Sequence, residues 1–279
     1  MVRSVQARRC QRPTRRLAAV DIAEGLALAL ELAELADVIT IDRFRAADLV
    51  VETKPDLTPV TEADQAVERA LRAHLAKHAP SHGVLGEEFG DEYGDANVEG
   101  EFRWVIDPID GTKSYVRGVP IWATLIGLER AGELIVGVAS APALGMRWWA
   151  GRGMGAFRDG ERLGVSSVAT LGDAQLSFAW DTSERFHANG VGERLIALSH
   201  RCWRTRGIGD FWQHLLVAEG AFDVAIDPVV SLWDIAALIP IVEEAGGRWT
   251  AVDGRVDVDA GSFVCTNGLL HDAVVASLA

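Results

Sequence analysis

Two acids stand three residues apart in the segment WVIDPIDGTKSY, residues 104–115, where an apolar run ends. The proline between them fixes φ and suits the first position of a helical turn. We therefore expect Asp107 and Asp110 to lie on the same side of the chain. The N–H groups of Gly111 and Thr112, at the start of such a turn, would bind an anion. Carboxylates that hold hard cations beside an anion-binding turn are the parts needed for metal-assisted phosphoryl transfer.

Further acids stand where expected strands end or expected helices begin, at Asp64, at Glu87 with Glu88, and at Asp234. Acids at such edges often cap helices or face solvent, so each position alone is weak evidence. Their shared placement carries more weight, because separate strand ends can converge on one site. Mg²⁺ takes oxygen ligands, and no His and Cys cluster with metal-ligand spacing competes. The sequence therefore predicts a magnesium site built from carboxylates.

Other phosphate-handling motifs fit the sequence poorly. No G-x-x-x-x-G-K-[ST] run is present, which excludes a P-loop enzyme. The glycines of residues 151–157 lie between expected strands and open no helix, so we interpret them as turn glycines. Haloacid-dehalogenase-type phosphatases have one residue between the acids of D-x-D-G-T and use the first acid as a covalent nucleophile. Here two residues separate the acids, which favours metal ligands with water as the nucleophile.

The bulk composition is that of an ordinary globular protein, with 49% hydrophobic and 24% charged residues among 279. This length suffices for one large domain or two medium ones. No apolar run reaches the roughly 18 to 20 residues needed to cross a bilayer. Cys10, Cys202 and Cys265 are odd in number and far apart. Their spacing favours a reducing compartment, the cytoplasm, over a disulfide framework.

The net charge is −13, and it would be −19 without the six arginines of residues 1–20. So acidic a body is a poor nucleic-acid binder, and a membrane partner is not expected either. The Arg-rich start lacks the apolar segment of a secretory signal. A disordered tail, an organellar transit peptide and a misplaced start codon remain open for it, and we leave it out of the fold.

Hydrophobic periodicity, together with capping residues and turn-forming Gly and Pro, predicts the helices and strands that position these acids. Helices are expected over 21–44 and 62–78, the second with Thr61 as N-cap and Asp64 as its capping-box partner. A short strand at 83–88 precedes an acidic, Gly-rich loop at 91–101. Five more strands follow at 102–107, 123–129, 134–142, 146–151 and 155–160. The second half alternates strands at 174–180, 202–207, 222–227 and 262–267 with helices at 190–200, 210–219, 232–246 and 268–278. The pattern predicts an α+β domain over 21–158 and an α/β domain over 159–279.

Four segments resemble, in family order, the motifs of the inositol monophosphatase family, the lithium-sensitive, Mg²⁺-dependent phosphatases. They are KPDLTPVTEAD (54–64), LGEE (85–88), WVIDPIDGTKSYVRGVP (104–120) and LWDIAAL…EEAGG (232–247). The resemblance implies a layered αβαβα sandwich of the inositol monophosphatase and fructose-1,6-bisphosphatase type. It also implies a homodimer and a phosphate monoester as substrate.

The resemblance assigns two or three Mg²⁺ ions to particular ligands. Glu87, Asp107 and the carbonyl of Ile109 would hold the first ion. Asp107, Asp110 and Asp234 would hold the second, and Glu87 would also touch a weaker third. Two such ions would activate the attacking water and stabilise the leaving alkoxide.

The resemblance also assigns the reacting water and the phosphate. Asp64 and Thr112 would form a hydrogen-bonded pair that positions and activates the water, with Glu87 as a further catalytic group. The amides of Gly111 and Thr112 would bind the phosphate. Glu88 is as well explained by capping or by a contact behind the metal ligands.

The alcohol part of the substrate depends on residues 204–234. The Gly-Asp-aromatic pattern at Asp210, Phe211 and Trp212 resembles the histidinol-phosphate phosphatase branch, whereas inositol phosphatases typically have a small residue after the glycine. Histidinol phosphate carries an ammonium and an imidazole, which a carboxylate can pair with and an aromatic ring can stack on. Asp227 occupies a position at which relatives contact the substrate.

Alternative interpretations remain for this segment. Asp210 could serve only as the N-cap of the following helix, and Trp212 is more typical of a core residue than of a stacking one. Trp122 and Leu238 stand where relatives often have smaller residues, and either could reshape packing or the pocket. We expect hydrolysis of histidinol phosphate in histidine biosynthesis. The alternatives are inositol-1-phosphate or a broader set of sugar phosphates and, from another class, a protein-binding regulator on the same fold.

Overall fold

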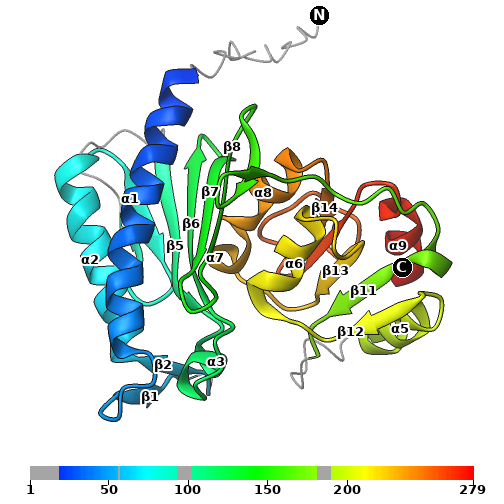
Figure 1. Cartoon of the computed structure of the whole chain (residues 1–279), viewed down its shortest axis with the longest axis horizontal. Coiled ribbons are helices and arrows are strands. Elements are labelled where there is room, and N and C mark those ends of the chain that lie inside the picture. Colours follow the sequence, from blue (N-terminus) through cyan, green and yellow to red (C-terminus); the bar gives the residue numbers. More distant parts are fainter. Residues whose placement is uncertain (1–18, 56, 93–101, 181–189) are drawn as a thin grey trace, which may run out of the picture.

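The computed structural model describes residues 19–55, 57–92, 102–180 and 190–279. They form five layers, which Figure 1 shows from left to right as helices, sheet, helices, sheet and helices. The expected αβαβα sandwich is therefore confirmed. The Arg-rich start up to residue 18 and the expected loop from residue 93 to 101 lie outside the described residues. The domain boundary near residue 158 stays a prediction.

An eight-stranded sheet forms the second layer. Its order is β10-β9-β8-β7-β6-β5-β3-β4, and all neighbours are antiparallel except the parallel pair β3 and β5. The strands are β3 (Gly83–Gly86), β4 (Gly90–Glu92), β5 (Phe102–Asp110), β6 (Ala123–Arg130), β7 (Glu133–Ala141), β8 (Met146–Gly151), β9 (Gly155–Arg158) and β10 (Glu161–Arg162). The central strands β5 to β7 are buried on both faces, as their continuous apolar runs predict.

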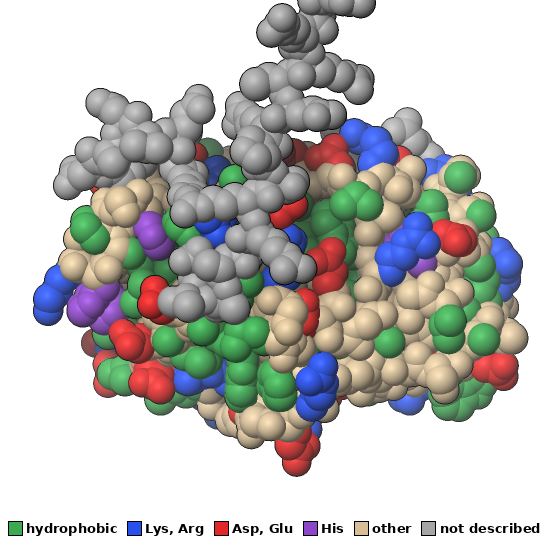
Figure 2. Space-filling view, turned by 90° about the horizontal axis from the view of Figure 1, so that it is seen from above, with side chains coloured by type: hydrophobic (Ala, Val, Ile, Leu, Met, Phe, Trp, Pro, Cys, Tyr) green, Lys and Arg blue, Asp and Glu red, His purple; other side chains and the backbone are tan. Residues whose placement is uncertain are grey.

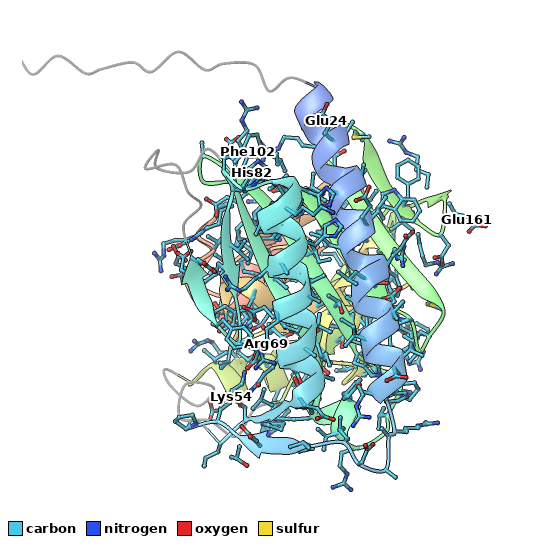
Figure 3. All side chains as sticks on the ribbon, turned by 90° about the vertical axis from the view of Figure 1, so that its left-hand side faces the viewer. Glu24, Lys54, Arg69, His82, Phe102 and Glu161 are labelled. Atoms are coloured by element: carbon cyan, nitrogen blue, oxygen red, sulfur yellow. The ribbon has the colours of Figure 1, made fainter. Side chains whose placement is uncertain are left out.

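Two long helices cover the outer face of this sheet. Helices α1 (Ala19–Arg43) and α2 (Glu62–His78) lie side by side over the strands in Figure 3. Leu32, Leu71 and Leu75 are fully buried in the cluster that these helices form with Trp104 and Ile126 of the sheet. Both helices begin and end within two residues of their expected bounds, because a long run of helix-forming residues and, for α2, a capping box are strong local signals.

A five-stranded sheet forms the fourth layer, in the order β12-β11-β13-β15-β14. Strand β11 is parallel to β12 and β13, and the remaining pairs are antiparallel. The strands are β11 (Gln175–Phe178), β12 (Arg204–Arg206), β13 (Val224–Asp227), β14 (Arg248–Thr250) and β15 (Phe263–Thr266). Helices α5 (Val191–Ser199) and α9 (His271–Leu278) cover its outer face, and the 3-10 turn η1 (Leu171–Asp173) leads into it.

The middle layer joins the two sheets through α6 (Asp210–Ala218), α7 (Leu232–Ile235) and α8 (Leu238–Glu244). The α7–α8 junction lies very close to the large sheet, since a Cβ on Gly137 of β7 would come within 2.0 Å of the Ala237 carbonyl oxygen. Only glycine permits that approach. The contact places the start of α7, which carries Asp234, beside the end of β5.

Four features of the local structure differ from the expectations. Strand β5 does not end at Asp107 but continues to Asp110, and the next helix, α3 (Thr112–Val116), begins only after Gly111. The single helix expected over 232–246 is broken into α7 and α8. The polar segment after residue 50 contains an unexpected hairpin, β1 (Val51–Thr53) and β2 (Pro59–Thr61), and β14 was not expected either.

The surface carries charged and apolar side chains side by side (Figure 2). On the face that Figure 2 shows, Lys and Arg side chains lie scattered among acidic and apolar ones. None of the helices in the described part of the chain has both the length and the apolarity that crossing a bilayer demands.

Candidate active site

A cleft of about 880 Å³ opens where the end of β5 meets the small sheet and the middle helices. Of the ten residues predicted for the site, only Asp64 is absent from its lining. The lining members are Glu87, Asp107, Ile109, Asp110, Gly111, Thr112, Asp210, Asp227 and Asp234. Residues more than a hundred positions apart in the chain therefore converge on one hollow.

Three of the predicted metal ligands come together at the floor of the cleft. Asp107, Asp110 and Asp234 each offer a carboxylate oxygen, and these oxygens lie within 4.8 Å of one another. The first two acids sit on either side of an irregularity in the pairing of β5 with β6, which lets both face the same site. Asp107 is 2% exposed, and its Oδ1 has no hydrogen-bond partner among the described residues.

Helix starts hold the other two acids in place. Asp110 Oδ2 accepts the Phe211 N–H at 2.6 Å, at the first turn of α6. Asp234 Oδ2 accepts the Ser231 N–H at 2.6 Å in a capping box at the start of α7. Each carboxylate thus accepts, through one of its oxygens, a hydrogen bond from a backbone N–H that would otherwise be unpaired.

Burial and mutual repulsion disfavour the ionised form of the acids in this cluster. Burial raises the pKa of Asp107 and of Asp110 well above the usual value. Neighbouring negative charges raise these pKa values further: the largest such contribution comes from Glu87 for Asp107 and from Asp210 for Asp110. Burial, with the charge of Glu87, likewise raises the pKa of Asp234 to about 7. An all-oxygen donor set with an unpartnered buried carboxylate oxygen fits a hard divalent ion.

Glu87 lines the same cleft but already has a protein partner. Lys54 Nζ lies 2.7 Å from Glu87 Oε1 and 2.6 Å from Glu88 Oε1. In Figure 3 Lys54 is seen near the β1–β2 hairpin, at the end of the molecule where α2 begins. The N–H of Glu88 donates to Glu68 Oε2 at 2.8 Å. Glu88 is therefore held behind the cleft by two contacts, and Lys54 is a site residue that spacing alone did not single out.

The expected phosphate seat lies at the start of α3. Gly111 is its N-cap and has φ of +84°. A Cβ there would lie 3.0 Å from the Ile121 carbonyl oxygen and 3.3 Å from Asp210 Oδ2. Glycine is needed both for the backbone conformation and for space. Lys113 follows in the cleft lining and supplies a positive charge close to the seat.

Asp64 and Thr112 are neighbours, although their contact is long. Thr112 Oγ1 lies 3.4 Å from Asp64 Oδ1 and donates at 2.9 Å to the Ile109 carbonyl. Asp64 Oδ2 accepts the Thr61 N–H at 2.8 Å, which completes the capping box expected for α2. Burial raises the pKa of Asp64 to about 6, because its fully enclosed carboxylate disfavours charge.

Asp210 and Asp227, the two predicted substrate contacts, both line the cleft. Burial, and next the charge of Asp227, raises the pKa of Asp210 to about 6, while Lys113 opposes that change. The idea that Asp210 only caps α6 is wrong, because Gly209 is the N-cap and no side chain makes the capping bond. Asp210 has φ of +48°, a left-handed conformation that Asp tolerates better than most residues. Such strain is typical of functional positions.

The aromatic residues of the cleft differ from those expected. Phe211 is buried in the core, and Trp212 packs against that core without lining the cleft. The rings that line it are those of Phe178, Trp180 and Trp233. Sequence reasoning missed the first two because nothing in their spacing links them to the acids. The third, Trp233, lies within the LWDIAAL motif, but its position there predicts no place in the cleft.

The two departures from the family pattern lie in packing. Trp122 is fully buried and packs edge-on against Tyr115, and Leu238 is 1% exposed at the start of α8, in the core between the two sheets. Neither lines the cleft. Both therefore fill space behind the site.

A sequence model of the inositol monophosphatase family matches residues 21–279. The chain belongs to the inositol monophosphatase family. A histidinol-phosphatase of Mycobacterium tuberculosis is 54% identical over 260 residues, which cover 91% of this chain and 98% of that protein. A histidinol-phosphatase of Streptomyces coelicolor is 49% identical over 267 residues, covering 92% and 98%. The expected likeness to the histidinol-phosphate phosphatase branch is confirmed.

Solved inositol monophosphatases share the fold. The Thermotoga maritima IMPase superposes with a TM-score of 0.81 at 31% identity, over 91% of this chain and 96% of that one. The inositol monophosphatase of Anabaena superposes with a TM-score of 0.80 at 28% identity, over 92% and 96%. This member of the inositol monophosphatase family is a phosphoric monoester hydrolase, and its family is in general Mg²⁺-dependent.

Proposed function

We propose that the chain hydrolyses histidinol phosphate, the ester of a cationic amino alcohol, with water as the nucleophile. One observation carries the choice of alcohol: two carboxylates, Asp210 and Asp227, line the same cleft, and the charge of Asp227 disfavours the ionised form of Asp210. A cationic group between them would relieve that cost. Aromatic rings line the same cleft and offer faces for an imidazole.

We further propose that two or three Mg²⁺ ions are held in the cleft, the first by Glu87, Asp107 and the Ile109 carbonyl and the second by Asp107, Asp110 and Asp234. A bound ion would supply the positive charge that makes water easier to deprotonate and that offsets the charge of the phosphate. Glu87 keeps Oε2 for this role, because Lys54 occupies only Oε1. The oxygen-only donor set supports the choice of ion.

The protein groups divide the remaining chemistry. Thr112 Oγ1 would accept a hydrogen of the attacking water and pass its own hydrogen to Asp64 Oδ1, giving up its bond to the Ile109 carbonyl. Asp64 suits this task, since a pKa of about 6 makes it a base that is ionised at neutral pH. The Gly111 and Thr112 amides would hold the phosphate, and Lys113 would add positive charge beside it. Asp210 and Asp227 would bind the alcohol portion.

Steady-state kinetics test the substrate. Phosphate release with Mg²⁺ is measured for histidinol phosphate, inositol-1-phosphate, fructose-1,6-bisphosphate and 3′-phosphoadenosine-5′-phosphate. The proposal expects the highest kcat/KM for histidinol phosphate. A higher kcat/KM for inositol-1-phosphate would replace it by the second candidate, inositol-1-monophosphatase or a broad sugar phosphatase. That candidate draws support from the metal acids and the phosphate seat, which recognise no particular alcohol.

We also propose a cytoplasmic homodimer. The dimer is the family expectation, and the cytoplasm accords with the free thiols of Cys202 and Cys265. Sedimentation equilibrium of the full chain would test the assembly. A monomer at micromolar concentration would contradict it.

A further inference from the structure

A chain of four buried polar side chains runs beneath the substrate side of the cleft. It passes from β11 through α6 to β13, elements that lie next to one another in Figure 1. Its members, with their exposed fractions, are Ser177 (0%), Gln213 (0%), Asp227 (9%) and His214 (1%). Only Asp227 lines the cleft. Polar groups this deep in an apolar core cost free energy unless they are paired, so these four hydrogen-bonded side chains call for an explanation.

The direction of each hydrogen bond follows from the donors available. Ser177 Oγ accepts the Ile208 N–H at 3.2 Å and donates to Gln213 Oε1 at 2.8 Å. The amide nitrogen of Gln213, which can only donate, then lies 2.7 Å from Asp227 Oδ2. A carboxylate oxygen can only accept, so every link has one donor and one acceptor.

His214 adds a second donor to the same oxygen. Its Nε2 lies 3.1 Å from Asp227 Oδ2, which places the hydrogen on Nε2 because the carboxylate must accept. Its Nδ1 is buried with no hydrogen-bond partner among the described residues, and its ring packs on Phe263 at 4.7 Å. A buried ring nitrogen without a partner is unfavourable, so packing alone would favour an apolar ring here. The contact to Asp227 is what explains a histidine.

We propose that Gln213 and His214 are positioning residues that hold Oδ2 of Asp227, so that Oδ1 is presented to the ammonium group of the substrate. This rests on the proposed hydrolysis of histidinol phosphate. The two donors share one oxygen, and Oδ1 makes no hydrogen bond within the described part of the chain. The link through Ser177 ends at the Ile208 N–H, two residues before Asp210. The same series of hydrogen-bonded side chains therefore sets the spacing of Asp210 and Asp227, the two carboxylates that would face the cation.

The test separates binding of the cation from chemistry at phosphorus. Gln213→Met and His214→Phe keep the volume and remove the donors, and Ser177→Ala removes one link with little risk to folding. Each is assayed with histidinol phosphate and with glycerol 2-phosphate, which has no cationic group. A loss of ground-state contacts raises KM and spares kcat, so we expect KM for histidinol phosphate to rise about tenfold in the first two variants and about threefold in Ser177→Ala. Both constants for glycerol 2-phosphate should stay within about twofold of the wild type.

A double-mutant cycle shows whether the effect passes through the carboxylate. In an Asp227→Asn background, Gln213→Met should change KM for histidinol phosphate by less than about twofold, because residues that act through one group are not additive. His271→Phe is the matched control, since His271, like His214, is a buried and hydrogen-bonded histidine. Its partners are the hydroxyls of Thr250 and Thr266, and it does not line the cleft. It should lower Tm and leave both KM values unchanged.

The outcomes separate the two proposals. A wild-type enzyme without preference for histidinol phosphate over glycerol 2-phosphate would overturn the proposed substrate and the ammonium role with it. A wild-type enzyme with that preference, whose variants lose equally on both esters or still lose in the Asp227→Asn background, would overturn the positioning role alone. If Gln213→Met does not fold, Ser177→Ala decides by the same criteria.

Discussion

Asp210→Asn removes one charge from the substrate side of the cleft without changing the shape of the side chain. Asn is the right replacement because the backbone there has φ of +48°, which Asn adopts more readily than Ser or Ala. A hydrogen bond between charged partners contributes about 1.5 to 3 kcal/mol, and 1.4 kcal/mol is a factor of about ten. Since Asp227 remains to bind the cation, we expect the lower part of that range, a loss of about 10- to 30-fold in kcat/KM for histidinol phosphate.

The same variant should leave glycerol 2-phosphate nearly unaffected. Asp210 raises the pKa of Asp110, so removing its charge relieves repulsion in the metal cluster and does not weaken the phosphate seat. Asp159→Asn is the matched control, because Asp159 has φ of +50° and lies outside the cleft. Equal losses on both esters in Asp210→Asn, or the same change of preference in Asp159→Asn, would refute the assignment of Asp210 to the cation.

Three further predictions concern the metal cluster, the middle layer and a buried histidine. Asp107→Asn should abolish turnover. In EDTA the variant should nevertheless have a higher Tm than the wild type, because burial and the charge of Glu87 disfavour the ionised Asp107 carboxylate. In melting curves, added Mg²⁺ should raise the Tm of the wild type and leave that of the variant unchanged. Gly137→Ala should destabilise the protein by about 2 to 4 kcal/mol in urea unfolding, because its Cβ would overlap the Ala237 carbonyl; full stability with full activity would contradict the close packing. Burial, with the charge of Arg248, lowers the pKa of His271 to about 4. His271 therefore becomes protonated at a lower pH in the folded state than in the unfolded state. That contribution to stability is complete above about pH 6.5 and is lost as the pH falls towards 4; His271→Gln should lack this part of the slope, and identical slopes would contradict it.

Sequence reasoning succeeded where the signal is local. The start of α2 follows from Thr61 and Asp64 alone, and the capping box is present as expected. It failed at Pro108, where a helical turn was expected after Asp107. There the pairing of β5 with β6 decides the backbone, because a proline is tolerated at an irregularity of the ladder, and the Pro108 carbonyl accepts the Thr124 hydroxyl at 2.8 Å. Tertiary pairing of this kind leaves no trace in a window of a dozen residues.

The resemblance of four motifs to the family was enough to predict which acids would meet, but the groups around those acids were not predictable. Lys54 reaches Glu87 across 33 residues, and Phe178 and Trp180 enter the cleft from a strand end that carries no acid. Each depends on how the hairpin and the small sheet are placed against the large one. Residue type and spacing identify a cluster of acids, whereas the partners of those acids follow only from the fold.

Three acids of the site also serve as caps, and this explains how such a repulsive cluster can form before any cation arrives. Asp64, Asp110 and Asp234 each give one oxygen to the backbone N–H groups at the start of a helix. A helix start carries partial positive charge, so it offsets part of the repulsion between the carboxylates. It also fixes their orientation, so that a cation meets side chains that have already lost their rotational freedom. Asp107 Oδ1 has no such donor within the described residues, so a bound cation would be the partner that this buried oxygen lacks.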